Sequence, residues 1–66
     1  MPRTTGLAEL EYLPQAHADA AAAMRELLAV CDAKASPSRA AIEAADRAYM
    51  AVGMLLGTLR RARRAA

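Results

Sequence analysis

Apolar and polar positions follow the period of an α-helix in two segments of the chain. In each segment, apolar or small residues recur at alternating steps of three and four, the spacing of one helix face. The spacing predicts two helices, over residues 14–34 and 37–64. The first row is Leu10, Leu13, His17, Ala20, Met24, Leu27 and Cys31, and the second row is Ile42, Ala45, Tyr49, Val52, Leu56 and Leu59.

Proline marks the start of each predicted helix. Pro14 disfavours helical backbone at Leu13, so residues 1–13 are expected to form an N-terminal arm or a short helix, with a kink or break at Pro14. Pro37 suits the first position of a helix because it has no amide hydrogen to leave unpaired, and Ser36 before it is a favourable N-cap. The second helix is therefore expected to begin at Pro37.

The short connection between the two segments predicts an antiparallel hairpin. Only Ala35–Ser38 separates them, which forces neighbouring helices to run in opposite directions. In such a hairpin the two rows come into register, with Met24 opposite Tyr49 and Leu27 opposite Ala45. We therefore expect an all-α fold in a single domain, residues 1–66: a coiled-coil-like antiparallel two-helix hairpin in which these two rows form the contact.

The small size of the chain indicates that the hairpin needs a partner. It has 66 residues, of which 56% are hydrophobic but only 3% aromatic, and much of the hydrophobic content is alanine. In a domain below about 70–80 residues, the hydrophobic core rarely contributes more than about 3–5 kcal/mol to the free energy of unfolding. We expect the hairpin to be completed by a partner protein, which would make it an adaptor or co-chaperone that binds a helical partner through an apolar face. The alternative is dimerisation, which would make it a homodimeric four-helix-bundle regulator that could bind nucleic acid through its arginine-rich C-terminus.

Apolar residues outside the two rows are candidates for the partner contact. Met50 and Met54 are flexible side chains of the kind found on contact surfaces, and Leu28 either joins them or simply flanks the first row. Gly53 and Gly57 each cost a helix about 1 kcal/mol relative to alanine, which close approach of a neighbouring backbone would explain. We predict these five residues as partner-binding residues.

The charge distribution suggests a second kind of partner. Residues 1–35 carry three basic and five acidic residues, whereas residues 36–66 carry six basic and two acidic ones. The last basic residues are Arg60, Arg61, Arg63 and Arg64, which could contact the phosphates of a nucleic acid or an anionic membrane surface, or could simply suit a helix C-terminus. The chain has few aromatic residues and a net charge of only +2, so we expect a protein partner in preference to a nucleic acid.

Several other functions are not supported by any residue pattern. The chain has one histidine, His17, and one cysteine, Cys31, so it offers no internal disulfide, metal-ligand set or catalytic constellation, and no glycine-rich phosphate loop is present. We expect neither an enzyme nor a cofactor. No apolar run reaches the roughly 20 residues of a membrane span, and no signal peptide is evident. The expected location is the cytoplasm.

One family has a similar size and pattern. An Ala/Leu-rich first helix, Ala20–Val30, is followed by a second helix with the segments AADRA at 44–48 and MLLGTL at 54–59. Over residues 15–59 the chain resembles the small E-component co-chaperones of type III secretion needle subunits. The resemblance implies a cytoplasmic protein that joins a tetratricopeptide-type chaperone and keeps an aggregation-prone needle subunit soluble before export. It assigns no binding residue.

Overall fold

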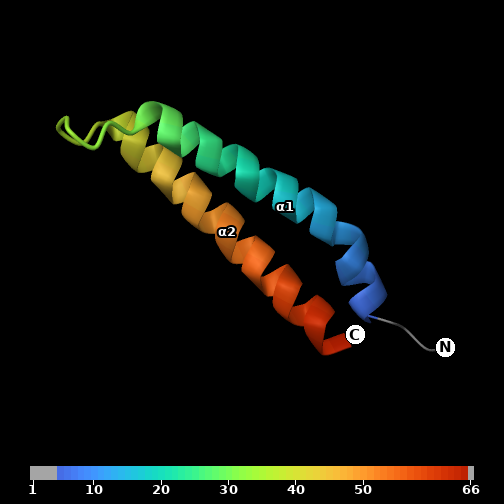
Figure 1. Ribbon diagram of the computed structural model, residues 1–66. Helices are drawn as coiled ribbons and strands as arrows, with labels where there is room; N and C mark the ends of the chain where they lie inside the picture. The colour runs from blue at the N-terminus through green and yellow to red at the C-terminus, as the bar shows by residue number, and fades with distance from the viewer. Residues whose placement is uncertain (1–4, 66) are drawn as a thin grey trace.

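The fold is an antiparallel helical hairpin. The computed structural model describes residues 5–65, and the side chains of residues 10–64. Helix α1 (Thr5–Val30) and helix α2 (Arg39–Ala65) lie side by side and are joined by a turn at one end (Figure 1). The molecule measures 55 × 15 × 14 Å. The predicted all-α antiparallel hairpin is thus confirmed.

Helix α1 continues through Pro14, so the predicted helix start at this residue is wrong. Residues 5–13 belong to α1, whereas the prediction for residues 1–4 lies outside the described part of the chain. Figure 1 shows α1 changing direction in its N-terminal turns. Proline removes one hydrogen bond and its ring presses on the carbonyl of Leu10, one turn earlier, so a change of direction there relieves the clash without ending the helix.

The connection is longer than the sequence predicts, because α1 ends at Val30 rather than at residue 34. Asp32 ends it: its Oδ1 accepts a hydrogen bond from the amide of Lys34 at 2.9 Å, and its carbonyl accepts one from Ala35 at 3.1 Å. An aspartate that bonds its own backbone two residues on favours a turn over a helix. The connection therefore covers residues 31–38.

Helix α2 begins two residues later than predicted, at Arg39. Its N-cap is Ser38, whose Oγ accepts a hydrogen bond from the amide of Ala41 at 3.0 Å. The prediction that Ser36 caps a helix beginning at Pro37 is therefore wrong. The other end of α2 carries Arg63 and Arg64 in its last turn, where cations favourably meet the helix dipole.

The contact between the helices is built from small side chains, which we call the inner seam. Its most buried members are alanines and one threonine, all 6% exposed or less, and no large side chain of the described residues is fully buried. On α1 it includes Leu13, Ala16, Ala20, Ala23 and Leu27, and on α2 it includes Ala41, Ala44, Ala48, Ala51, Leu55, Thr58 and Ala62.

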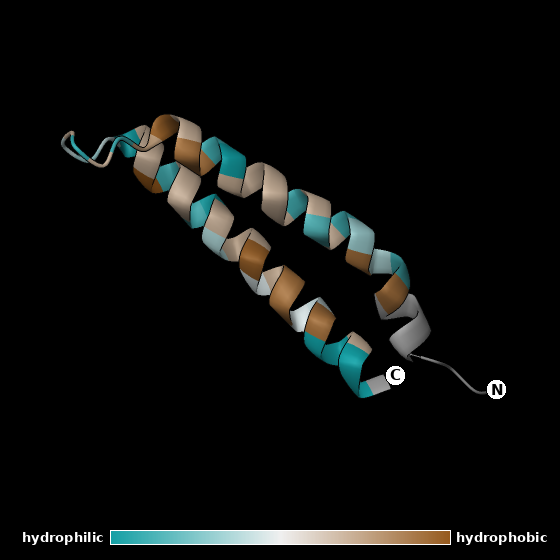
Figure 2. Ribbon diagram, viewed as in Figure 1, coloured by the Kyte–Doolittle hydropathy of each residue, from teal (hydrophilic) through white to brown (hydrophobic). Residues whose placement is uncertain are grey.

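The inner seam of α2 is not the row that the sequence predicts. The predicted row is one residue out of step with it and lies largely in solvent, with Ile42 at 62% and Tyr49 at 78% exposure. In the predicted α1 row, Leu13, Ala20 and Leu27 belong to the inner seam, as predicted. Its other residues are exposed, so the prediction is wrong for them. Both α2 rows have the same three-and-four spacing, and the one with smaller side chains lets the helices approach more closely. Figure 2 shows the strongly hydrophobic residues of α2 gathered in its second half, opposite a weakly hydrophobic part of α1.

Replacing Ser38 with alanine should destabilise the hairpin, because the amide of Ala41 loses its acceptor. Substitutions of this kind cost about 1 kcal/mol, which lowers the Tm of a domain of this size by about 4–8 °C. Ser36→Ala is the matched control and should change the Tm by less than about 3 °C. Thermal unfolding followed by circular dichroism measures both, and equal losses in the two variants would contradict Ser38 as the N-cap.

Candidate protein-interaction surface

Large hydrophobic side chains lie mostly on the outside of this hairpin. Among the described residues, twelve are at least 39% exposed, whereas none is fully buried. Single exposed apolar residues are ordinary on a protein surface, but contiguous groups of them mark contact sites. The twelve are Leu10, Tyr12, Met24, Leu28, Val30, Ile42, Tyr49, Met50, Val52, Met54, Leu56 and Leu59.

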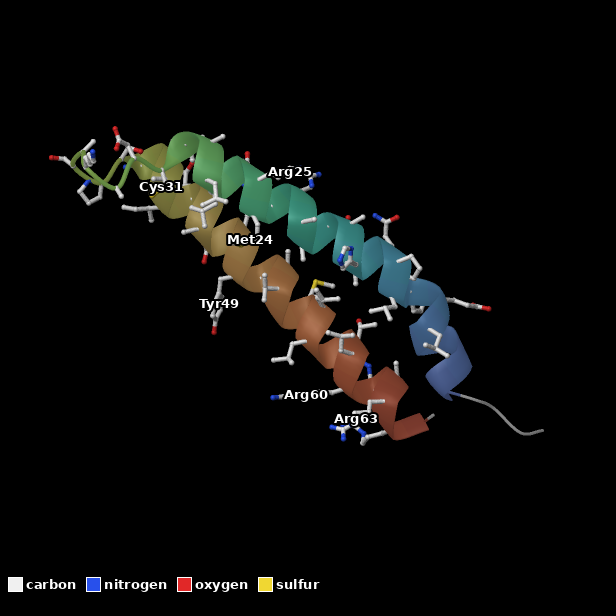
Figure 3. All side chains as sticks on the ribbon, viewed as in Figure 1. Met24, Arg25, Cys31, Tyr49, Arg60 and Arg63 are labelled. Carbon is white, nitrogen blue, oxygen red and sulfur yellow. The ribbon has the colours of Figure 1, made fainter. Side chains whose placement is uncertain are left out.

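The first group is the row that the sequence placed between the helices, which we call the outer stripe: Ile42, Ala45, Tyr49, Val52, Leu56 and Leu59. It extends along α2 for about 26 Å, at 1.5 Å per residue. Tyr49 points away from α1 (Figure 3). Met24 and Leu27 of α1 line a groove together with Tyr49, Val52 and Leu56, so this side of the hairpin is apolar on both helices.

The second group lies on another side of α2 and is called the methionine strip: Met50, Gly53, Met54 and Gly57. The two methionines are 59% and 69% exposed. They line a groove with Tyr12 and Ala16 of α1, and its borders are polar. The strip is one contiguous patch because its members are spaced i, i+3, i+4 and i+7.

The structure therefore brings together four of the five predicted partner-binding residues. The fifth, Leu28, is 71% exposed and lies one turn beyond Met24, on the side of α1 that faces the same way as the outer stripe. Gly53 adjoins both surfaces, since the groove that contains Met24 also extends around α2 to Gly53 and Met54. Sequence reasoning missed the outer stripe as an exposed surface because it had assigned those residues to the interior.

The space around the two glycines is not filled by α1. A Cβ atom built on Gly53 would meet nothing within 4 Å, and one built on Gly57 would meet only the guanidinium of Arg61, 3.2 Å away at its nearest nitrogen. A side chain of that length can move aside. The close approach that the sequence suggests for these glycines is therefore not supplied within the hairpin.

An ion pair joins the helices beside the methionine strip. Arg47 Nη2 lies 3.0 Å from Glu26 Oε2, and Arg47 Nε donates a hydrogen bond of 3.1 Å to Glu26 Oε1. This hydrogen bond, together with the charge of Glu26, raises the pKa of Arg47 above its ordinary value. Both side chains are about half exposed, so the pair sets the register of the helices more than it stabilises them.

The described residues show no candidate metal centre. They contain no group of three or more His, Cys, Asp or Glu side chains placed to hold a metal ion, and Cys31 is exposed at the end of the hairpin that carries the turn. Neither helix, over its described length, is long and apolar enough to cross a membrane. Arg60, Arg61, Arg63 and Arg64 are exposed at the end of α2, and Arg60 and Arg63 extend outward in Figure 3.

Comparison with models of known protein families, with curated proteins and with solved structures finds no match to this chain. The two exposed apolar surfaces and the arginine end of α2 are therefore the features from which function is inferred.

Replacing Gly53 with alanine should stabilise the isolated hairpin, because the new methyl group meets open space and alanine favours a helix by about 0.5–1 kcal/mol. The expected rise in Tm is about 2–8 °C. Ala22→Gly, at an exposed position of α1, is the control and should lower the Tm by a similar amount. A fall in Tm for Gly53→Ala would mean that another backbone already approaches Gly53 in the purified protein.

Proposed function

We propose that this chain is a small, non-enzymatic protein-protein interaction module, an adaptor or co-chaperone of the cytoplasm, that binds a helix of a partner protein along the methionine strip. The supporting observation is the exposure of Met50 and Met54 in a groove formed by both helices. The interior of the hairpin is mostly alanine, so burial of these side chains against a partner adds apolar contact that the chain cannot supply itself.

The groove has the properties that a helical ligand requires. Ala16 and Ala51 line it, and Met50 and Met54 form one of its sides. Methionine is unbranched and polarisable, so it adapts to the shape of an apolar helix face. Gly53 lies outside the lining of this groove, beside Met54, and its open surface would let a partner backbone approach α2 there. Binding of this kind is recognition of an amphipathic helix in a groove.

The borders of the groove favour a partner helix with charges of both signs. On the α1 side the amide of Gln15 donates a hydrogen bond of 2.8 Å to Asp19, which leaves a carboxylate at the border. On the α2 side the border carries Asp46, Arg47 and Arg61, and Arg47 is paired with Glu26. A complementary helix would place a basic residue toward Asp19 on the α1 side and residues of both signs toward α2.

A tetratricopeptide-type chaperone is the specific partner that the resemblance to E-component co-chaperones implies. Such proteins stack helix pairs into concave surfaces, so they offer exposed helices to a narrow groove. In this version of the proposal, the chain and the chaperone together cover the apolar surface of a third protein before its export.

Site-specific photocrosslinking in the source cell tests the proposal. A photoreactive amino acid in place of Met54 should give a discrete adduct with one protein, identified by mass spectrometry, whereas the same amino acid in place of Ala22 should give none. With the identified partner, Met54→Asp should weaken binding at least tenfold while circular dichroism shows unchanged helicity, and Met54→Leu should retain binding. Full binding by Met54→Asp would exclude the methionine strip as the contact.

Nucleic acid is the second candidate partner, because four exposed arginines lie within the last turns of α2. We expect single-stranded RNA to bind only non-specifically, with a Kd of about 10⁻⁴–10⁻⁶ M at physiological salt. Replacement of all four arginines by glutamine should abolish that binding and leave the complex at Met54 intact. Binding that is much tighter and depends on RNA sequence, measured by fluorescence anisotropy, would favour a nucleic-acid function instead.

A further inference from the structure

The outer stripe is a long row of uncharged residues on α2. Its side chains lie largely in solvent, from 42% exposure at Val52 to 78% at Tyr49. The charged residues between its ends, Glu43, Asp46 and Arg47, line a groove with Ile42 and Ala45 at its start. Between Tyr49 and Leu59, α2 carries no charged residue. The methionine strip is shorter and is bordered by charges.

We infer that a second copy of this chain covers the outer stripe, so that two hairpins form a four-helix bundle in which α2 of each protomer lies against α1 of the other. The steps of three and four along the stripe are those of a helix-packing row, which indicates that the occupant is a helix lying along α2. In this arrangement the two-fold axis runs parallel to the helices, and both turns lie at the same end of the bundle.

The surface area supports a second copy as the occupant. The chain exposes 5315 Å², whereas a compact protein of this mass exposes about 4,000 Å². A compact body of about 14 kDa exposes about 6,700 Å², so association of two hairpins can bury up to about 3,900 Å² in total. Permanent homodimers bury about 2,000–5,000 Å². The excess surface of one hairpin is thus of the size that a stable dimer requires.

The side chains at matching heights are complementary. The ion pair between Glu26 and Arg47 places these two residues at one height along the hairpin, which puts Met24 level with Tyr49. A two-fold axis parallel to the helices preserves height, so Met24 of one protomer meets Tyr49 of the other. By the same register Ala21 meets Val52, where a small residue faces a larger one, as interdigitating helices require.

Two hairpins can also pack about a two-fold axis perpendicular to the helices. The net charges of α1 and α2 favour the parallel axis over this alternative. Helix α1 carries Arg25 against Glu9, Glu11, Asp19 and Glu26, whereas α2 carries six arginines against Glu43 and Asp46. An axis perpendicular to the helices would place α2 against α2 and bring like charges together. The parallel axis pairs each basic α2 with an acidic α1, and it leaves the methionine grooves on the outer sides of the bundle.

Sedimentation over a dilution series tests the dimer with the intact chain. We expect a dimer of about 14 kDa that dissociates at or below micromolar concentration. Val52→Asp should raise the dissociation constant at least 100-fold. Ala22→Asp places the same charge at an exposed position of α1 that lines neither groove and should leave the dimer intact. A monomeric wild-type chain at 100 µM, or a dimer disrupted by Ala22→Asp and not by Val52→Asp, would overturn the inference.

A second experiment tests the orientation of the two hairpins and changes no residue of the outer stripe. It can therefore be carried out even if Val52→Asp unfolds the chain. A spin label on Ser36→Cys in a Cys31→Ser background lies in the turn, and pulsed electron resonance measures the distance between the two labels. Turns at the same end predict a separation below about 30 Å, about three interhelical spacings. A separation near the 55 Å length of the hairpin would overturn the arrangement. Because crosslinking at Met54 reports on the other groove, a monomeric chain would leave the adaptor proposal standing.

Discussion

The alanine contact between α1 and α2 constrains the rest of this structure. Ala20, Ala44 and Ala48 are at most 5% exposed and let the two backbones lie close together. A methyl group buries little area, so the contact sets geometry while contributing a small hydrophobic free energy. Leu13, Leu27 and Leu55 join the seam but are only half-buried, and the other large apolar side chains of the described residues are exposed. The exposed surfaces of the molecule are thus a direct result of how small its interior residues are.

Helix α2 is apolar on three sides, and only one of them faces α1. Ala48 faces α1, Tyr49 lies on the outer stripe, and Met54 lies on the methionine strip; these three residues are separated by about 100–140° around the helix axis. A helix that is hydrophobic around most of its circumference belongs in the interior of an assembly. The charged residues of α2 are concentrated toward its two ends, which keeps its middle section free for packing.

The sequence predicts the type, number and antiparallel order of the helices, because these depend on helix propensity, period and a short connection. It does not predict which row of α2 faces α1. The rows through Ala48 and Tyr49 are one residue apart and have the same period, so only tertiary packing distinguishes them, and the larger residues were the wrong choice. Ser36 and Ser38 both flank Pro37, and local pattern alone does not decide between them. The same ambiguity of rotation explains why Leu28 lies on the side of the outer stripe and away from Met50 and Met54.

The position of the methionine grooves has a consequence for affinity. In a two-fold bundle packed through the outer stripes, the two grooves open on opposite sides, so the assembly is bivalent. A partner that is itself oligomeric, or that carries two suitable helices on a linker, would then bind the second groove as an intramolecular step at high effective concentration. Avidity of this kind would let two short, individually weak grooves hold a large partner firmly, and it would be lost as soon as the bundle dissociates.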